Sequence, residues 1–445
     1  MKKLVYCALI AVCLSTVALA QTISLTSPSN GATVGSPVTF TATANGGSHP
    51  VSAIWIYIDD QPAIKVQTAS LNSSLALAPG SHKVVATMWN SIGQLASQLI
   101  HITVSSTVTP ASSSQYQSNF TATSNYLANS SPSVMDGAIL FTPQEIMPYF
   151  SNLAAIGMTK DPNRMPQVVA WMNWYINHFN WPDKWGLYGT VYDYTVSNGV
   201  AIPTGDADST DSYAATYLTL AWNAWQSGNP EARSFILGLN YQLDVIGGVI
   251  VLTQQSDGLT WAKPDWQIKY LMDNCEVYRG LRDLASLYQN AFGDATKAAW
   301  YNAAAQRSLN GILTMWQNGK WAYYKDGAGN MPAPNLASWY PDAAAQVFPM
   351  LQGVLSPSDA RSQQTYANFN AAWPGWPTLS FNSQDPFPWD LVAVAAATMG
   401  DNSRVATYIN SMQGKYVNSG FPWPFYDAEG GWFMRANNYM MGKGL

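Results

Sequence analysis

The spacing of apolar residues changes once along the chain, near residue 126. Before that point, apolar and polar residues roughly alternate in short runs, which are "SPVTFTATA", "SAIWIYIDD", "SHKVVATMWN" and "QLIHITVS". Turn-forming segments such as "SPSNG" and "ANGGSHP" separate these runs. Alternation with a period of two residues, interrupted by frequent turns, is typical of the strands of a small sandwich. Residues 21–105 are therefore predicted to form an all-β, immunoglobulin-like (Ig-like) domain.

Residues 126–445 instead carry apolar residues at helical spacing, and about eleven helices are predicted there, the last starting near Arg435. Tight breaks such as "FGDATK" and "LSPSDA" alternate with long aromatic breaks at 180–205, 254–265, 317–336 and 373–388. This alternation indicates helical hairpins arranged in a ring, with the long loops gathered at one end. An open α-solenoid would give a similar pattern, although no sequence repeat of fixed period is present.

Two further segments precede the helical region. Residues 1–20 have the features of a secretory signal peptide, with Lys2 and Lys3 before an apolar core and Ala18-Leu19-Ala20 as the cleavage site. A secreted or periplasmic protein is therefore expected. Residues 106–125 are rich in Ser and Thr and almost uncharged, which predicts a linker.

Composition narrows the classes of function. The net charge is -5 and only 11% of the residues are charged, so the chain has neither the basic footprint of a nucleic-acid binder nor a polybasic membrane patch. The chain combines few charged residues with 19 Trp and 24 Tyr, which is unusual for a protein surface. Some of these rings are therefore expected to line a groove for an uncharged ligand such as a sugar. We expect a monomer with no membrane span beyond the signal peptide.

Scarce histidine and cysteine exclude several chemistries. His178 and Cys275 are the only such residues in the helical region, so a zinc site cannot be built there. No "G-x-S-x-G" elbow and no phosphate-binding glycine motif is present. We therefore expect neither a metal nor a cofactor.

The stretch "TGDADSTDSYAATYLTLAW" concentrates Asp206, Asp208 and Asp211 at the start of a predicted helix, directly after the longest aromatic loop. Asp208 and Asp211 are expected to share one face of the first turn. One interpretation is structural, because Asp caps helix N-termini and complements the helix dipole. A calcium loop of the EF-hand type is excluded, because the required Gly and Glu positions hold Asp211 and Tyr217.

A second acidic pair, Asp273 and Glu276, lies within "LTWAKPDWQIKYLMDNCEVYRGL" and also shares a helix face. The structural alternative is a salt bridge to Arg279 or Arg282. The functional interpretation is that this pair faces the first acidic cluster across a cleft, since glycoside hydrolysis requires a protonated carboxyl on one side of the scissile bond and an ionised one on the other.

The candidate catalytic residues are therefore Asp208, Asp211, Asp273 and Glu276, with Glu276 expected as the acid and Asp211 as the base. Acids and aromatic rings in the neighbouring loops are the candidate sugar-binding residues: Asp206, Trp185, Tyr188, Tyr192, Asp193, Trp261, Asp265, Trp266, Trp389 and Asp390. Asp342 and Glu429 also lie beside aromatic residues and are weaker candidates.

Two resemblances follow from these motifs. "SPSNGATVGSPVTFTA" and "LAPGSHKVVATMWNSIGQ" resemble bacterial Ig-like modules, most of which are spacers. The helical region resembles the six-hairpin, (α/α)6-barrel glycosidases. Its segment "DADSTDSYA" is similar to the "D-x-D-x-D-x-A" motif of glycoside hydrolase family 8, with Ala214 or Ala215 in the small positions. The spacing departs from that motif by one residue, and the upstream glutamate motif of that family is missing.

The superfamily resemblance implies a secreted glycoside hydrolase that cleaves a neutral or weakly charged poly- or oligosaccharide by two-carboxylate catalysis, with inversion. One alternative is a polysaccharide lyase on the same fold, which would act through Tyr and Arg. The other is a non-catalytic surface protein that binds glycans or partners.

Overall fold

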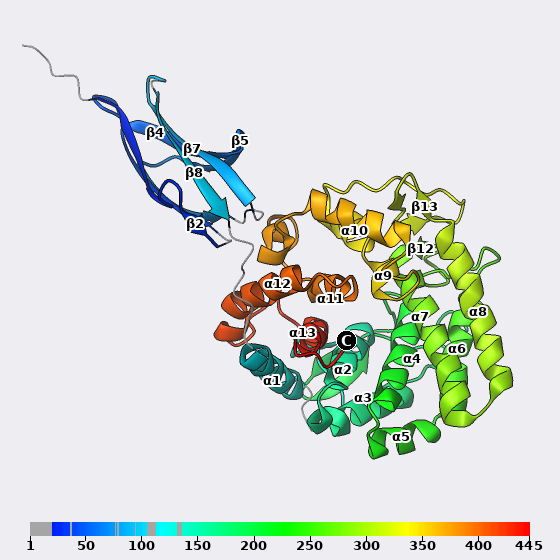
Figure 1. Cartoon of the computed structure of the whole chain (residues 1–445). Helices are drawn as coiled ribbons and strands as arrows, with labels where there is room; N and C mark the ends of the chain where they lie inside the picture. Colours follow the sequence, from blue (N-terminus) through cyan, green and yellow to red (C-terminus); the bar gives the residue numbers. More distant parts are fainter. Residues whose placement is uncertain are drawn as a thin grey trace, which may run out of the picture. The chain divides into compact units, whose positions relative to one another are not determined.

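The chain folds into two compact units, Met1–Val108 and Thr109–Leu445, each described here by itself. The computed structural model describes residues 20–445 except 36–37, 76, 78–79, 94, 105–112 and 131–135 (Figure 1). The predicted signal peptide lies almost entirely outside the described residues.

The first unit is a sandwich of two sheets. One sheet has the strand order β1-β3-β6 and the other β2-β8-β7-β4-β5, and β2 pairs with β8 in parallel whereas the other pairs are antiparallel. The strands are β1 (Thr22–Ser27), β2 (Thr33–Val34), β3 (Val38–Asn45), β4 (Val51–Ile58), β5 (Gln61–Val66), β6 (Ser70–Leu75), β7 (Gly80–Asn90) and β8 (Leu95–Val104). Alternate residues such as Phe40, Ile56 and Ile102 point into one apolar core. The predicted Ig-like sandwich is confirmed.

The second unit is a closed ring of helices (Figure 1). The helices are α1 (Ser113–Asn129), α2 (Pro148–Met158), α3 (Met165–Asn177), α4 (Asp211–Gln226), α5 (Pro230–Leu237), α6 (Asn240–Thr253), α7 (Leu271–Leu287), α8 (Ala295–Leu313), α9 (Phe348–Leu351), α10 (Ala360–Ala372), α11 (Asp390–Thr398), α12 (Asn402–Lys415) and α13 (Asp427–Met440). Short strands in the connections are β9 (Glu145–Ile146), β10 (Tyr194–Ser197), β11 (Val200–Pro203), β12 (Lys269–Tyr270), β13 (Trp316–Gln317), β14 (Lys320–Trp321) and β15 (Tyr324–Lys325).

Outer and inner helices alternate along the chain, in the pairs α1–α2, α3–α4, α6–α7, α8–α9, α10–α11 and α12–α13 (Figure 1). Inner helices such as α4 and α11 are buried along most of their length, whereas outer α10 buries only a stripe through Ser362, Thr365 and Phe369. The connection leading from an outer to an inner helix is long, and the return connection is mostly short. The predicted ring of hairpins is thus confirmed.

Three predicted boundaries are wrong. The predicted linker 106–125 is helical from Ser113, because the polar α1 buries Tyr116, Phe120 and Leu127. The segment "PEARSFILGLNYQLDVIGGVIVL" reads as one helix in the sequence, but it forms α5 and α6, which meet at 71° after Gly238 ends α5. The last helix begins at Asp427 rather than near Arg435, since its glycines, which weaken helical propensity, are used for close packing.

Glycines at the closure of the ring bring α2 and α13 together. A Cβ added to Gly157 would collide with the backbone of Gly431, and a Cβ added to Gly431 would collide with the carbonyl oxygen of Leu153. Gly430 likewise fits against Leu127 of α1. The last helix is therefore held against both helices of the first hairpin by close packing at these glycines.

We expect Gly431→Ala to lower the free energy of unfolding by about 1–3 kcal/mol or more, because the added methyl has only backbone to displace. Chemical denaturation measures this, with Gly414→Ala as the control, since a Cβ at Gly414 meets no atom. Equal stability of the two variants would contradict the packing described for α2 and α13.

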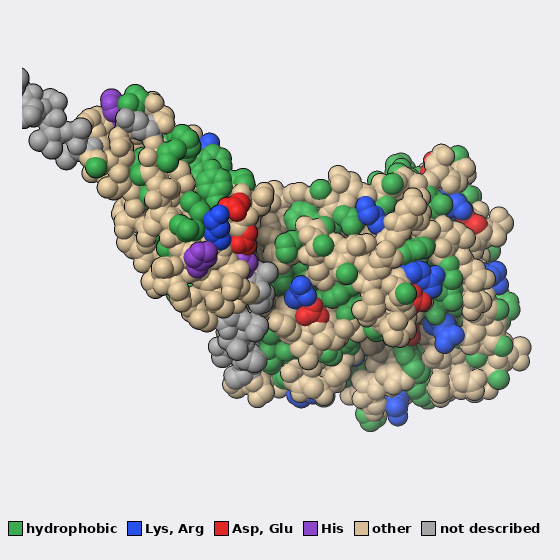
Figure 2. Space-filling model, turned by 45° about the horizontal axis from the view of Figure 1, so that its top comes forward, with side chains coloured by type: hydrophobic (Ala, Val, Ile, Leu, Met, Phe, Trp, Pro, Cys, Tyr) green, Lys and Arg blue, Asp and Glu red, His purple; other side chains and the backbone are tan. Residues whose placement is uncertain are grey.

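The face seen in Figure 2 carries few charged side chains, and several Lys or Arg side chains on it lie beside Asp or Glu. Within the described ranges, no single helix is long and apolar enough to cross a membrane. The bent pair α5 and α6 meets that test only together, by length and composition.

Candidate active site

A cavity of about 700 Å³ opens at the end of the ring where the long connections lie. Each connection from an outer to an inner helix contributes to its wall. These contributions are Phe141, Asp193, Lys263, Tyr340, Phe387 and Tyr426. The first turns of the inner helices complete it with Ser212 of α4, Asp273 of α7 and Glu429 of α13. The expectation that long loops and acidic helix starts would meet at one end of the ring agrees with this arrangement.

One group of cavity-lining carboxylates comes from α7 and the connection before α4. Asp193 accepts a hydrogen bond from the Tyr213 hydroxyl (2.7 Å), and burial raises its pKa to about 6. Burial raises the pKa of Asp273 well above its usual range, and the charges of Asp211, Glu276 and Asp208 add to this rise. Both effects favour the protonated form of Asp273, which is the form that can donate a proton into the cavity.

A second group comes from the opposite part of the ring, where Asp385 and Glu429 lie. Glu429 accepts hydrogen bonds from the backbone N–H groups of Trp389 (3.0 Å) and Asp390 (2.7 Å) at the start of α11. Burial raises its pKa to about 7, and those two hydrogen bonds limit the rise. Trp389 adopts the left-handed conformation (φ 58°), which is costly for a bulky residue, and its ring lines the cavity. A carboxyl with a pKa near 7 suits a general base.

Aromatic rings cover much of the remaining wall. The rings of Tyr340 and Trp389 lie 5.2 Å apart, and those of Tyr149 and Tyr213 are stacked 6.0 Å apart. Phe387 meets Tyr426 edge-on, with 5.5 Å between centroids. Such rings offer flat apolar faces between the polar carboxylates. A sugar has apolar ring faces and polar hydroxyl groups, so this wall is complementary to it.

Among the cavity-lining residues that the structure describes, Lys263 is the only cation. Its ammonium lies 3.0 Å from Asp206, which Lys184 also contacts at 3.0 Å. Although desolvation opposes the change, these two ammonium groups hold the pKa of Asp206 below its usual range. The charge of Lys263 is thus already compensated, and the cavity is acidic overall.

Five of the predicted site residues line this cavity, namely Asp193, Asp206, Asp208, Asp273 and Trp389. Asp211 and Glu276 do not. Asp211 is fully buried beneath the wall and accepts hydrogen bonds from the Thr260 hydroxyl (2.5 Å) and the Ser212 N–H (2.8 Å). Helix α4 begins at Asp211, so Asp208 lies in the loop and the expected shared helix face does not form.

Glu276 lies one helical turn deeper than Asp273 on α7 and lines a separate, smaller cavity. It accepts a hydrogen bond from Tyr149 (2.8 Å), whose ring reaches the large cavity. Arg279 pairs with Asp283 (2.7 Å), and no ion pair joins an arginine to Asp273 or Glu276 in the described part of the chain. The salt-bridge interpretation of this acidic pair is therefore not supported.

The other predicted sugar-binding residues lie outside the cavity wall. Trp185 lies under the ammonium groups of Lys184 (4.4 Å) and Lys263 (5.7 Å), and Tyr192 accepts a hydrogen bond from the Lys184 N–H (2.7 Å). The exposed ones are Tyr188, Asp265 and Trp266, the half-buried one is Trp261, and the fully buried one is Asp390. These residues therefore do not belong to the lining of the large cavity.

Sequence reasoning missed Asp385, Tyr149 and Tyr213 and ranked Glu429 too low. A signal for Asp385 was present, because "SQDPFPWD" lies in one of the long aromatic breaks. Glu429 was hidden by the misplaced start of α13. No cluster of three or more potential metal ligands occurs in the described ranges.

We expect Glu276→Gln to flatten the pH dependence of stability. Burial raises the pKa of Glu276 to about 8, so its contribution to stability is complete below its ordinary pKa near 4.5 and is lost as pH rises toward 8. The wild-type protein should lose stability over this window by several kcal/mol more than the variant, since one pKa unit is worth about 1.4 kcal/mol. Urea unfolding at pH 5 and pH 8 measures this, with exposed Glu145→Gln as control. Parallel pH profiles for wild type and Glu276→Gln would exclude a protonated Glu276.

Comparison with known proteins now adds to this geometry. Residues 22–86 match the sequence profile of the bacterial Ig domain. The helical unit is similar to a GH63 mannosylglycerate hydrolase from Thermus thermophilus in complex with glucose (11% identity, TM-score 0.52), over 72% of this chain and 99% of that one.

A glycosidase variant in complex with glucose is similar to this chain at 11% identity and TM-score 0.53, over 75% of this chain and 98% of that one. An uncharacterised conserved protein from Thermus thermophilus matches at 13% identity and TM-score 0.52, over 73% of this chain and 99% of that one. The helical unit has the (α/α)6-barrel fold of glycosidases. At these identities the likeness concerns the fold, and the expected similarity to family 8 is not found. No curated protein sequence matches the chain.

Proposed function

We propose that the helical unit is a glycoside hydrolase that cleaves a neutral or weakly charged poly- or oligosaccharide. The observation that carries this proposal is the cavity itself, in which carboxylates from two parts of the ring meet among aromatic rings. A volume of about 700 Å³ accommodates a few sugar residues. The (α/α)6-barrel fold supports the same reaction class but does not assign it.

In the proposed mechanism Asp273 is the general acid and Glu429 the general base. Protonated Asp273 donates its proton to the glycosidic oxygen as that bond breaks, while ionised Glu429 takes a proton from the water that attacks the anomeric carbon from the other face. Asp208 stabilises the positive charge that develops on the sugar. Because the two carboxylates come from separate parts of the ring, we propose that a water molecule fits between them and that the anomeric configuration is inverted.

Two alternatives are less well supported. A lyase acting on an acidic polysaccharide would need cations to bind its substrate, and the acidic wall offers only the compensated Lys263 among its described residues. A purely glycan-binding protein would not require a carboxyl whose pKa is raised by burial and by three neighbouring carboxyls. Export from the cytoplasm, either to the periplasm or out of the cell, is expected from the signal-peptide pattern and is part of the proposal.

The test is a screen of the purified full chain against neutral glucans, mannans and their oligosaccharides. Reducing ends should appear with wild type and not with the double variant Asp273→Asn/Glu429→Gln, and proton NMR of the first product should show the inverted anomer. Products with unsaturated ends that absorb ultraviolet light would identify a lyase instead. Binding without hydrolysis would overturn the enzymatic proposal.

A further inference from the structure

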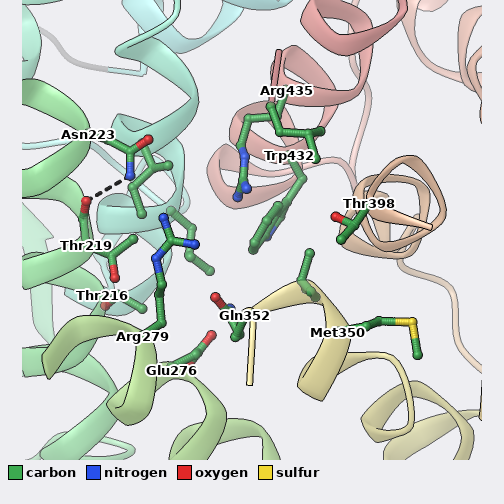
Figure 3. A pocket seen from close by; sticks show the side chains of 15 residues that line it. Thr216, Thr219, Asn223, Glu276, Arg279, Met350, Gln352, Thr398, Trp432 and Arg435 are labelled. Atoms are coloured by element: carbon green, nitrogen blue, oxygen red, sulfur yellow. Dashed lines mark hydrogen bonds between the residues drawn. The ribbon is translucent and has the colours of Figure 1, made fainter. Parts of the chain in front are cut away.

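A second, smaller cavity of about 220 Å³ lies deeper along the same helices (Figure 3). The large cavity uses the first turns of α7 and α13, whereas this one is lined by Arg279 and Arg435 from later turns. Gln352, in the segment after α9, contributes a polar side chain to its wall. The small cavity therefore differs from the large cavity in its position along the helices and in the charge of the side chains that line it.

Arg435 forms no ion pair in the described structure, although the charge of Asp283 acts on it. The Arg435 guanidinium lies over the Trp432 ring (4.4 Å), and its Nε has no hydrogen-bond partner. Arg279 uses its Nε on Asp283, and Figure 3 shows both guanidinium groups directed into the same space. Two guanidinium groups turned toward each other in a partly buried space repel one another unless an anion lies between them.

No described acid forms an ion pair with Arg435, although the C-terminal Leu445 also lies on the cavity wall. Lys160 lies close enough for Arg435 and Arg279, after burial, to lower its pKa to about 8, so it adds to the positive charge. The pKa of Arg435 itself is lowered to about 9, first by burial and then by the charge of Arg279, while the charge of Asp283 opposes this change. Among the acids nearby, Asp283 is paired with Arg279, and Glu276 is held protonated by burial beside Tyr149.

We propose that this cavity binds a small oxyanion, a phosphate or the carboxylate group of a small acid, between Arg279 and Arg435. The planar guanidinium fork matches the oxygen spacing of such groups. Gln352 provides a further donor on the wall. The volume admits a small anion and excludes an oligosaccharide, so this site is separate from the proposed reaction and does not depend on it.

The test measures binding of inorganic phosphate and of malonate to the full chain by isothermal titration calorimetry at constant ionic strength. Wild type should bind at least one of the two anions. The anion that binds more strongly shows whether the site prefers a phosphate or a carboxylate. Arg435→Met should weaken that affinity at least about tenfold, because hydrogen bonds to charged groups are lost. Arg435→Lys, which retains the charge but not the fork, should give an intermediate affinity.

Arg282→Met is the matched control, because it removes the same charge at an exposed position on the helix that carries Arg279. This variant should bind the anion as wild type does. Thermal unfolding with and without the anion provides a second measurement, in which each variant is compared with its own baseline, so that a loss of stability cannot imitate a loss of binding. Absence of binding to wild type, or equal weakening by Arg282→Met and Arg435→Met, would overturn the proposal.

Discussion

Asp273→Asn is expected to lower kcat by about 10²–10⁴-fold, the range that a positioned proton donor contributes. Asparagine has nearly the shape of the acid but cannot transfer a proton to the glycosidic oxygen. Because burial and three neighbouring carboxylates already disfavour a charge at this position, the substitution should not lower stability. The measurement is hydrolysis of an active substrate from the glycan screen, compared with an aryl glycoside whose leaving group needs no proton.

The aryl glycoside distinguishes a proton donor from a residue that only shapes the cavity. With Asp273→Asn, activity on that substrate should fall much less than activity on the natural glycan. Asp265→Asn is the control, since Asp265 is exposed outside the cavity and should leave both rates unchanged. An equal loss on both substrates would show that Asp273 does not act as the acid.

Glu429→Ala is expected to have a second large effect, again a loss of about 10²–10⁴-fold in kcat, because no other group would activate water at that face of the sugar. The pH dependence of kcat/KM gives independent evidence for the role of Glu429 as the base. Since the pKa of Glu429 is raised to about 7, wild-type activity should fall as pH drops below 7 and the base becomes protonated. The acidic limb of this profile should be missing from the residual activity of the variant.

Azide separates the chemical role of Glu429 from its structural one, because its carboxylate also accepts two N–H groups at the start of α11. With an activated substrate, azide can occupy the space left by the side chain and attack in place of water. A glycosyl azide product and partial recovery of turnover would support the role of base. Failure of azide to restore turnover, with a folded variant and an unaffected Glu231→Ala control at exposed Glu231, would count against it.

The ring of hairpins could be predicted because apolar spacing and loop length are local properties of the sequence. How deep a residue lies within the ring is not a local property of the sequence. Asp208 and Asp211 were expected to share a helix face, but the helix starts at Asp211, which leaves Asp208 at the cavity and places Asp211 beneath its wall. Asp273 and Glu276 do share a face of α7, yet one turn of difference assigns them to different cavities.

The far wall of the site illustrates a second limit. Glu429 is followed by Gly430 and Gly431, which in isolation argue against a helix. In the folded ring these glycines allow α13 to approach α1 and α2 closely, so tertiary packing overrides propensity. That contact depends on residues almost three hundred positions apart, which no local pattern reveals.

The contact of α13 with the first hairpin also has a consequence for biosynthesis. The Ig-like unit can fold before the helical unit is complete, because domains fold as units. The helical ring cannot close, and Glu429 cannot face Asp273, until α13 has been translated. Nascent chains that stop short of α13 should therefore expose the apolar inner faces of α1 and α2 and depend on chaperones.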